Sequence, residues 1–186
     1  MLKLKQFYRD VLTGLNSMIF EKHSDDYDCC NLNIVNNEGI SEDKILVTDS
    51  TFVFFIEKSK FPFDINAVIG KPMIKSNQVI KNILDDFHTH QIMNLYVIKD
   101  ISNDKILTFD AHNRITNKQE IRKLLIIENC TTNKKAWLSM QTMKYVDLDN
   151  VYIFGTDNNH PFVITNKSPI DFKNLEVLGI IMPVLV

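Results

Sequence analysis

The chain has 186 residues, of which 45% are hydrophobic and 24% charged, a composition typical of a globular domain that can bury a full core. Its formal net charge is −2, and its basic residues form no block or stripe, which argues against a nucleic-acid partner. The longest apolar run, residues 178–186, is too short to cross a bilayer, and residues 1–10 lack the apolar centre of a signal peptide, so we expect a cytoplasmic protein without a membrane partner.

The amino-terminal part of the chain is expected to form one helix and three strands. Apolar residues recur at three- and four-residue steps over 3–21, which predicts an amphipathic helix. Alternating apolar and polar residues predict a half-buried strand over 30–34, and two more strands follow over 44–47 and 51–57. The β-branched and aromatic residues of 51–57 indicate a strand that is covered on both faces.

A second, central helix and a hairpin are expected next. Ser76 is a favourable N-cap, and apolar residues on one face predict a helix from there to about His88. Strands are predicted over 92–99 and 105–110, with the polar residues 102–104 as the turn between them.

The remaining chain is rich in predicted strands. Residues 116–119 resemble a capping box, which predicts a turn of helix before the apolar residues 124–127. Three further strands are expected over 136–146, 150–155 and 161–166.

Residues 175–186 are the most apolar part of the chain, although chain termini are usually polar and frayed. We therefore expect this stretch to be buried, as an inner strand of its own sheet or against another subunit. Strand–helix–strand crossovers are too few for a parallel doubly wound sheet. The prediction is an α+β fold with an amino-terminal helix, one further central helix and a dominant antiparallel sheet, for which closure into a partial barrel is one option. Residues 1–186 are read as a single domain, with a soft boundary between two lobes near 58–75.

Histidine and aspartate occur close together at His88, His90, Asp110 and His112. Imidazole and carboxylate groups suit zinc or iron, and an open coordination position on such a metal would activate water. The structural alternative is that His88 and His90 end a helix, where imidazole interacts favourably with the negative end of the helix dipole. We favour the structural alternative and keep a metal-dependent hydrolase as a second hypothesis.

Three cysteines, Cys29, Cys30 and Cys130, are the candidate nucleophiles, with His112 or His160 as a base. A catalytic thiol needs a cationic neighbour or a helix N-terminus, and the sequence indicates neither beside a cysteine. An odd number of cysteines predicts reduced thiols. The lack of a CxxC pair predicts that the chain has no zinc ribbon. Buried structural cysteine is the favoured interpretation.

No cofactor is predicted, because the five glycines are scattered singly and form neither a dinucleotide-binding nor a Walker loop. The lack of a strong catalytic motif and the buried terminus favour a non-enzymatic interaction or assembly protein. The abundance of Asn, Lys and Ile is typical of AT-rich genomes, so a phage or viral structural or accessory component, in the host cytoplasm or the virion, is the expected origin. It would self-associate or bind a protein partner through its amino-terminal helix, its terminal strand or its edge strands. A small inhibitor or immunity protein is a further alternative.

Overall fold

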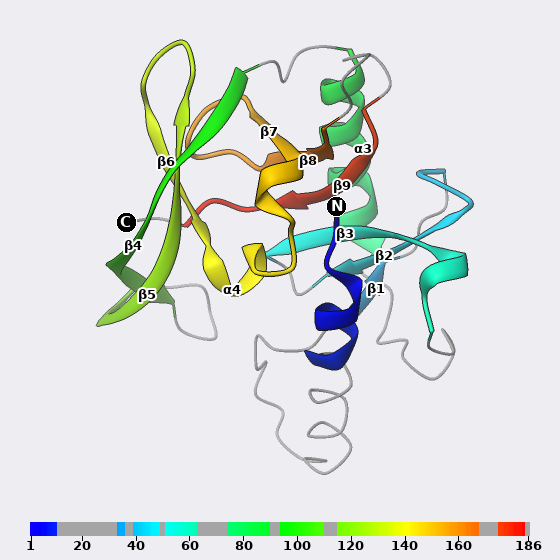
Figure 1. Ribbon diagram of the computed structural model, residues 1–186, viewed down its shortest axis with the longest axis horizontal. Coiled ribbons are helices and arrows are strands. Elements are labelled where there is room, and N and C mark those ends of the chain that lie inside the picture. The colour runs from blue at the N-terminus through cyan, green and yellow to red at the C-terminus, as the bar shows by residue number, and fades with distance from the viewer. Residues whose placement is uncertain are drawn as a thin grey trace.

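A computed structural model of the chain describes residues 1–10, 33–35, 39–48, 51–62, 74–89, 94–109, 115–167 and 175–184. Within these residues, helices and one antiparallel sheet form a mixed fold, which confirms the predicted α+β class (Figure 1). The sheet has nine strands in the order β1-β2-β3-β9-β8-β7-β4-β5-β6. The described strands are β1 (Asn33–Val35), β2 (Lys44–Thr48), β3 (Phe52–Glu57), β4 (Asn94–Phe109), β5 (Ile115–Asn129), β6 (Lys135–Ser139), β7 (Val151–Gly155), β8 (Phe162–Asn166) and β9 (Val177–Ile181). The described helical elements are residues 4–10, η1 (Lys58–Lys60), α3 (Ile74–His88), α4 (Met140–Met143) and η2 (Leu148–Asn150).

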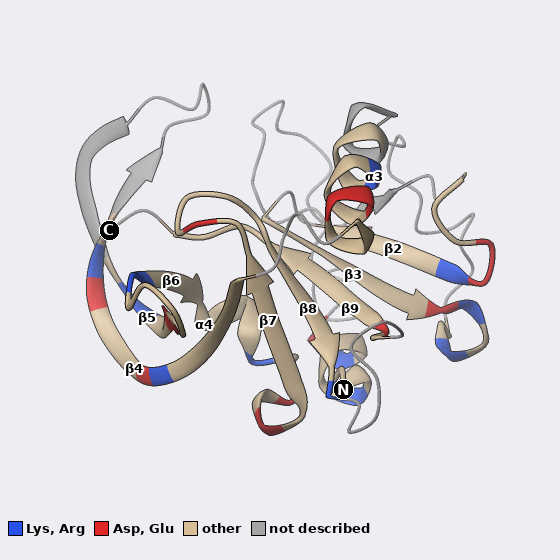
Figure 2. Cartoon of the chain, turned by 90° about the horizontal axis from the view of Figure 1, so that it is seen from above, with Lys and Arg blue, Asp and Glu red and all other residues tan. Residues whose placement is uncertain are grey.

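Alternate residues of the sheet face two separate apolar cores, one on each side. In β3, Phe54 and Ile56 belong to the first core, whereas Phe55 belongs to the second. Phe7 of the amino-terminal helix packs into the first core, and Ile80 of α3 packs into the second. The two helices therefore lie on opposite sides of the sheet (Figure 2). This arrangement confirms that β3 is covered on both faces, as its run of β-branched and aromatic residues predicts.

The terminal strand β9 runs through the middle of the sheet, between β3 and β8, and all five of its residues are buried. This confirms the predicted inner strand of the chain's own sheet. Gly179 lies directly opposite Phe54 in the ladder. A Cβ atom at Gly179 would stand 2.8 Å from Phe54 Cδ1 and 2.8 Å from the Val53 carbonyl oxygen, so only glycine permits this approach.

Other predicted elements appear near their expected bounds. The second helix is α3, and the strands expected at 150–155 and 161–166 are β7 and β8. The amino-terminal helix is described only over residues 4–10, and the remainder of the predicted 3–21 lies outside the described residues. The single-domain organisation, with its boundary near 58–75, stays a prediction. No helix within the described residues is both long and apolar enough to pass through a membrane.

The predicted hairpin turn at 102–104 is wrong. These residues lie inside β4, which pairs without a break from Ser102 and Asn103 to Leu124 and Lys123 of β5, and the chain reverses only after Phe109. The polar side chains suggested a turn, but a strand on the surface has no need of apolar residues. Here Ser102 Oγ donates a 2.6 Å hydrogen bond to Asp104 Oδ2 along the same strand.

Two local helix and strand predictions also fail. Residues 116–119 belong to β5, and Gln119 pairs with Leu107 of β4, so tertiary strand pairing overrides the capping-box pattern. The strand expected over 136–146 ends at Ser139 and is followed by α4. This turn of helix redirects the chain so that Met143 and Val146 enter the first core.

The sheet curls but is not closed into a barrel, so the partial-barrel option is wrong. β1 and β6 stand at opposite ends of the strand order and do not pair with each other. The chain after β9 occupies part of the β6 edge instead, because the Val184 N–H donates to the Trp137 carbonyl oxygen at 2.8 Å. The Trp137 carbonyl oxygen therefore already accepts a hydrogen bond, and a strand that closed the sheet at this edge would have to displace the donor.

Candidate functional site

The residues of the predicted metal site are only partly described. His88 ends α3, is exposed, and its Nδ1 lies 2.6 Å from the Leu84 carbonyl oxygen one turn earlier. His90, Asp110 and His112 lie outside the described residues. Among the residues that the structure describes, no group of three or more His, Cys, Asp or Glu side chains is arranged to hold a metal ion.

The candidate thiols are likewise only partly described, since Cys29 and Cys30 fall outside the described ranges. Cys130 is a free, exposed thiol in the turn between β5 and β6, so the expectation that it is buried is wrong. His160, its proposed base, contacts Asp157 instead, with Nδ1 2.9 Å from both carboxylate oxygens. This contact and backbone hydrogen bonds from Asn159 and His160 hold the pKa of Asp157 below its usual range.

The first exposed feature of the described chain is the outer part of the β4–β5 pair. β4 bonds β7 only through Asn94–Tyr96, and β5 bonds β6 only through Leu124–Glu128. Beyond these contacts, residues 97–109 and 115–123 pair with each other and have no strand on their outer edges within the described structure. We call these two segments the β-ribbon. It curves away from the helix-covered part of the sheet (Figure 2).

A β-bulge at Lys99 places two isoleucines on one face of the β-ribbon. Ile98 of β4 pairs with Ile127 of β5, and the next pair joins Asp100 to Ile126. β4 therefore advances by two residues where β5 advances by one. Ile98 therefore lies opposite Ile127, and Ile101 opposite Leu125, which puts all four side chains on one face. Ile127 and Leu125 are fully buried, whereas Ile98 and Ile101 are 38% and 42% exposed. The apolar core thus continues into a solvent-facing strip, Ile98 with Ile101, which we call the isoleucine strip.

The base of the β-ribbon is held firmly to the rest of the sheet. Tyr96 is buried, and its ring meets that of Phe162 edge to face, with centroids 4.9 Å apart. The turn after β5 is closed by Asn129, whose side-chain oxygen accepts the N–H groups of Thr131 and Thr132 at 2.8 and 2.9 Å. The isoleucine strip therefore lies next to a part of the sheet that these contacts hold in place.

Charges on this part of the molecule are mixed in sign. Lys99 Nζ lies 3.1 Å from Glu128 Oε1, and Asp100 Oδ1 accepts the Ile101 N–H at 2.7 Å. Figure 2 shows basic and acidic residues following one another along β4. The β-ribbon therefore offers apolar side chains and strand edges that have no strand partner in the described structure, and its charges are not of a single sign.

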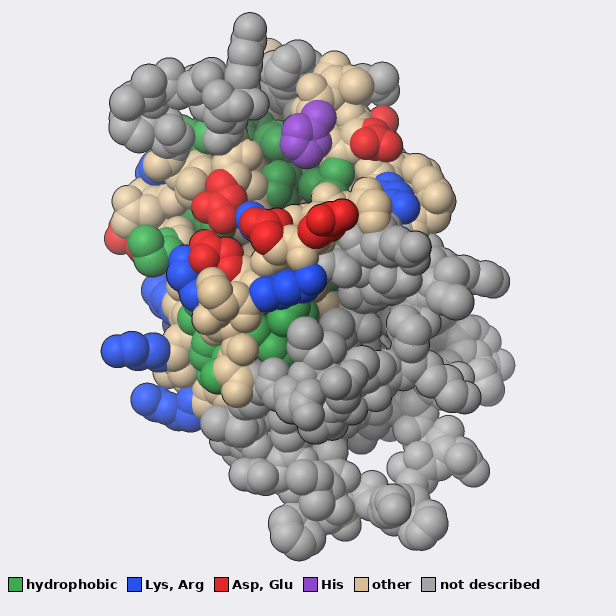
Figure 3. Space-filling view, turned by 90° about the vertical axis from the view of Figure 1, so that its right-hand side faces the viewer, with side chains coloured by type: hydrophobic (Ala, Val, Ile, Leu, Met, Phe, Trp, Pro, Cys, Tyr) green, Lys and Arg blue, Asp and Glu red, His purple; other side chains and the backbone are tan. Residues whose placement is uncertain are grey.

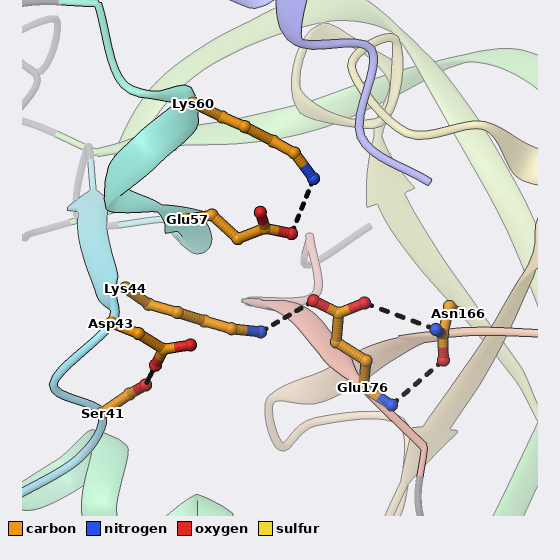
Figure 4. A network of polar contacts seen from close by, with 7 residues as sticks. All are labelled: Ser41, Asp43, Lys44, Glu57, Lys60, Asn166 and Glu176. Carbon is orange, nitrogen blue, oxygen red and sulfur yellow. Dashed lines mark hydrogen bonds and ion pairs between the residues drawn. The ribbon is translucent and has the colours of Figure 1, made fainter.

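A second feature is a cleft of about 640 Å³ between the amino-terminal segment and the ends of β3 and β9. Its lining in the described chain contains Lys, Arg and Glu but no His, Cys or Ser that could act as a nucleophile or a base near neutral pH. Two ion pairs lie at this end of the sheet: Glu57 with Lys60, at 2.7 Å, and Glu176 with Lys44, at 2.8 Å (Figure 4). The cleft is therefore a candidate binding site whose charged lining residues in the described chain are lysine, arginine and glutamate.

No family model, curated protein or solved structure matches this chain. Within the described chain, the features that bear on function are the β-ribbon and the cleft.

Sequence reasoning missed both surfaces. The expected turn at 102–104 divided β4 in two and concealed the β-ribbon, although the run 97–101 contains three apolar residues, Val97, Ile98 and Ile101, around two charged ones. The cleft depends on contacts between residues 1–9 and strands more than 40 positions away, which no local pattern indicates.

Proposed function

We propose that this protein is an interaction or assembly protein that binds another protein chain through the β-ribbon. The observation that carries this proposal is the isoleucine strip, two exposed isoleucines beside unpaired strand edges on a firmly anchored hairpin. Unpaired edges of this kind accept an additional strand, and neighbouring apolar side chains add affinity and register.

The energetics support contact with a partner. Burying an isoleucine fully is worth about 1.5–3 kcal/mol, and Ile98 and Ile101 each keep some two fifths of their surface in water. A partner strand that covered both would also satisfy the backbone N–H and C=O groups of the outer β4 edge. On the described part of the face seen in Figure 3, acidic and basic side chains lie near one another, with groups of hydrophobic side chains between them.

The test compares the wild type with the double variant Ile98→Lys/Ile101→Lys. Light scattering after size exclusion would report self-association, and capture from an extract of the native host would report a separate partner. We expect the double variant to lose the association, because two charges would face the partner in place of apolar contacts. The matched control is Val79→Lys on α3, a 57% exposed apolar residue on the opposite side of the molecule from the first core, which should leave association unchanged.

Two results would contradict the proposal. One is a wild-type chain that stays monomeric at all concentrations and captures nothing from its host. The other is an association that survives in the Ile98→Lys/Ile101→Lys variant, which would place the docking surface elsewhere.

A further inference from the structure

The cleft beside the amino-terminal segment has an apolar floor that continues from the first core. Ile56 of β3 and Leu178 of β9 are 1% and 6% exposed, and Leu2 and Leu4 of the amino-terminal segment pack partly buried against the same core. Such a floor favours an aliphatic group over a polar one, because it offers no hydrogen-bond partners.

The rim of this cleft is basic, although the chain as a whole has a formal net charge of −2. Its described lining contains four cationic side chains and two carboxylates. Both carboxylates are already engaged, Glu57 by Lys60 and Glu176 by Lys44. Figure 4 shows the two pairs separately, with Glu176 also joined to Asn166.

Apart from Lys60, the cationic side chains of the described lining are those of Arg9 and of two lysines, Lys3 and Lys5. Neither ammonium group has a hydrogen-bond or ion-pair partner among the described residues. Asp147, whose carboxylate is hydrogen-bonded at 2.8 Å by Asn150, lies within electrostatic reach of Lys3 and offsets part of its charge. The described lining still carries more cationic than anionic side chains, so an anion in the cleft would meet a net positive charge at its rim.

Both walls of the cleft are fixed before any ligand arrives. The Lys3 N–H donates to the Tyr145 carbonyl oxygen at 2.6 Å, and the Asp147 N–H donates to the Met1 carbonyl oxygen at 2.8 Å. Farther along, the Tyr8 hydroxyl donates to the Lys60 carbonyl oxygen, which ties the helix to η1. A preformed site loses less free energy in ordering its walls on binding.

From these observations we propose that the cleft binds a small single-chain amphiphile with an anionic head group. The aliphatic chain would lie on Ile56, Leu178 and Leu4, and the head group would lie at Lys3 and Lys5. The volume of about 640 Å³ falls within the range of about 300–1,000 Å³ that small-molecule sites occupy. This site is separate from the β-ribbon, so it goes beyond the proposed function and is tested independently of it.

The experiment titrates dodecanoate, below its micellar concentration, into the full-length chain and follows binding by calorimetry and by backbone amide NMR shifts. We expect saturable binding at one site, with the shifts centred on residues 2–6, 55–57 and 176–178. Dodecylammonium, which has the same chain and the opposite charge, should bind at least about tenfold more weakly.

The double variant Lys3→Gln/Lys5→Gln should weaken dodecanoate binding by about tenfold, as expected for two solvent-exposed ion contacts. Its matched control, Lys105→Gln/Lys123→Gln on the β-ribbon, removes the same charge from exposed positions outside the cleft and should leave the affinity unchanged. Far-ultraviolet circular dichroism of both variants checks that the fold is retained.

Three outcomes would overturn the proposal: equal binding of dodecylammonium, unchanged affinity in Lys3→Gln/Lys5→Gln, or NMR shifts located away from the cleft. Tighter binding of an alternating Glu-Leu peptide than of dodecanoate would also overturn it, because the cleft would then be a peptide site.

Discussion

The β-ribbon and β9 are both parts of one sheet, yet they meet opposite environments. β9 has only five residues, but it has a strand on each edge and an apolar core on each face. The strands that form the β-ribbon, β4 and β5, have 16 and 15 residues, and the outer edges of the β-ribbon have no strand partner in the described structure. Position within the sheet, and not strand length, decides which segment belongs to the interior and which is available to a partner.

The same contrast appears within a single cross-strand pair. Ile101 and Leu125 lie opposite each other on one face, but Leu125 is fully buried and Ile101 is 42% exposed. Leu125 is also paired with β6, whereas Ile101 is on an open edge. The additional strand on one side is what separates a core residue from a surface residue here.

The largest expected effect tests this pair directly. Leu125→Ala should lower the free energy of unfolding by about 2–5 kcal/mol, because it removes buried methyl groups and leaves a cavity. Ile101→Ala should lower it by no more than about 1 kcal/mol, since much of that side chain is already in water. Urea denaturation of both variants measures the difference, and equal losses would show that the β-ribbon is covered in solution.

Gly179→Ala should destabilise the covered part of the sheet by about 1–3 kcal/mol. The new methyl group would collide with the Phe54 ring and with the Val53 carbonyl oxygen, and neither can move far inside a packed core. Asn103→Ala, on the exposed surface of β4, is the matched control and should change stability by less than about 0.5 kcal/mol. Thermal unfolding followed by circular dichroism distinguishes the two; a neutral Gly179→Ala would mean that β9 is less tightly packed than described.

Asp10→Asn should cost about 0.5–1 kcal/mol and loosen the helix that covers the first core. Hydrogen bonds from Lys144, at 2.7 Å, and from Tyr145, at 2.8 Å, hold the pKa of Asp10 below its usual value. Because the pKa is lowered on folding, this carboxylate stabilises the fold above about pH 4, and the contribution is lost as the pH falls through the lowered pKa.

The variant should therefore depend less on pH below about pH 4 than the wild type does. Hydrogen exchange should rise at residues 4–10 and remain unchanged at residues 97–106. Faster exchange in the β-ribbon instead would show that the two regions are coupled.

The last expected effect, similar in size to that of Asp10→Asn, concerns the turn between β7 and β8. Asp157→Ala should cost about 0.5–1 kcal/mol, because the carboxylate accepts the N–H groups of Asn159 and His160 at 2.8 and 3.1 Å. Binding through the β-ribbon should be unaffected, which a repeat of the association measurement would check. A loss of association in Asp157→Ala would indicate that this turn contributes to the docking surface.

The elements that were predicted well are those whose residues repeat with one period and are buried. β3 and α3 show clear strand and helix patterns, and β9 is apolar throughout, so each appears near its expected position. The failures at 102–104 and 116–119 fall in the β-ribbon. At 102–104 the strand is partly exposed, and partial exposure permits polar residues that resemble a turn. For the candidate sites, the sequence indicated edge strands in general but neither the isoleucine strip nor the cleft.

The sequence by itself determined that the fold is α+β, that the sheet is antiparallel and that the terminal strand is buried. These follow from local periodicity and apolarity, which neighbouring residues encode. Only the tertiary structure decided that the sheet stays open, that β4 and β5 extend beyond it, and that residues 1–9 wall a cleft against β3 and β9. Those features depend on which distant segments occupy each strand edge, and pairing between distant segments is set by the packing of the whole chain.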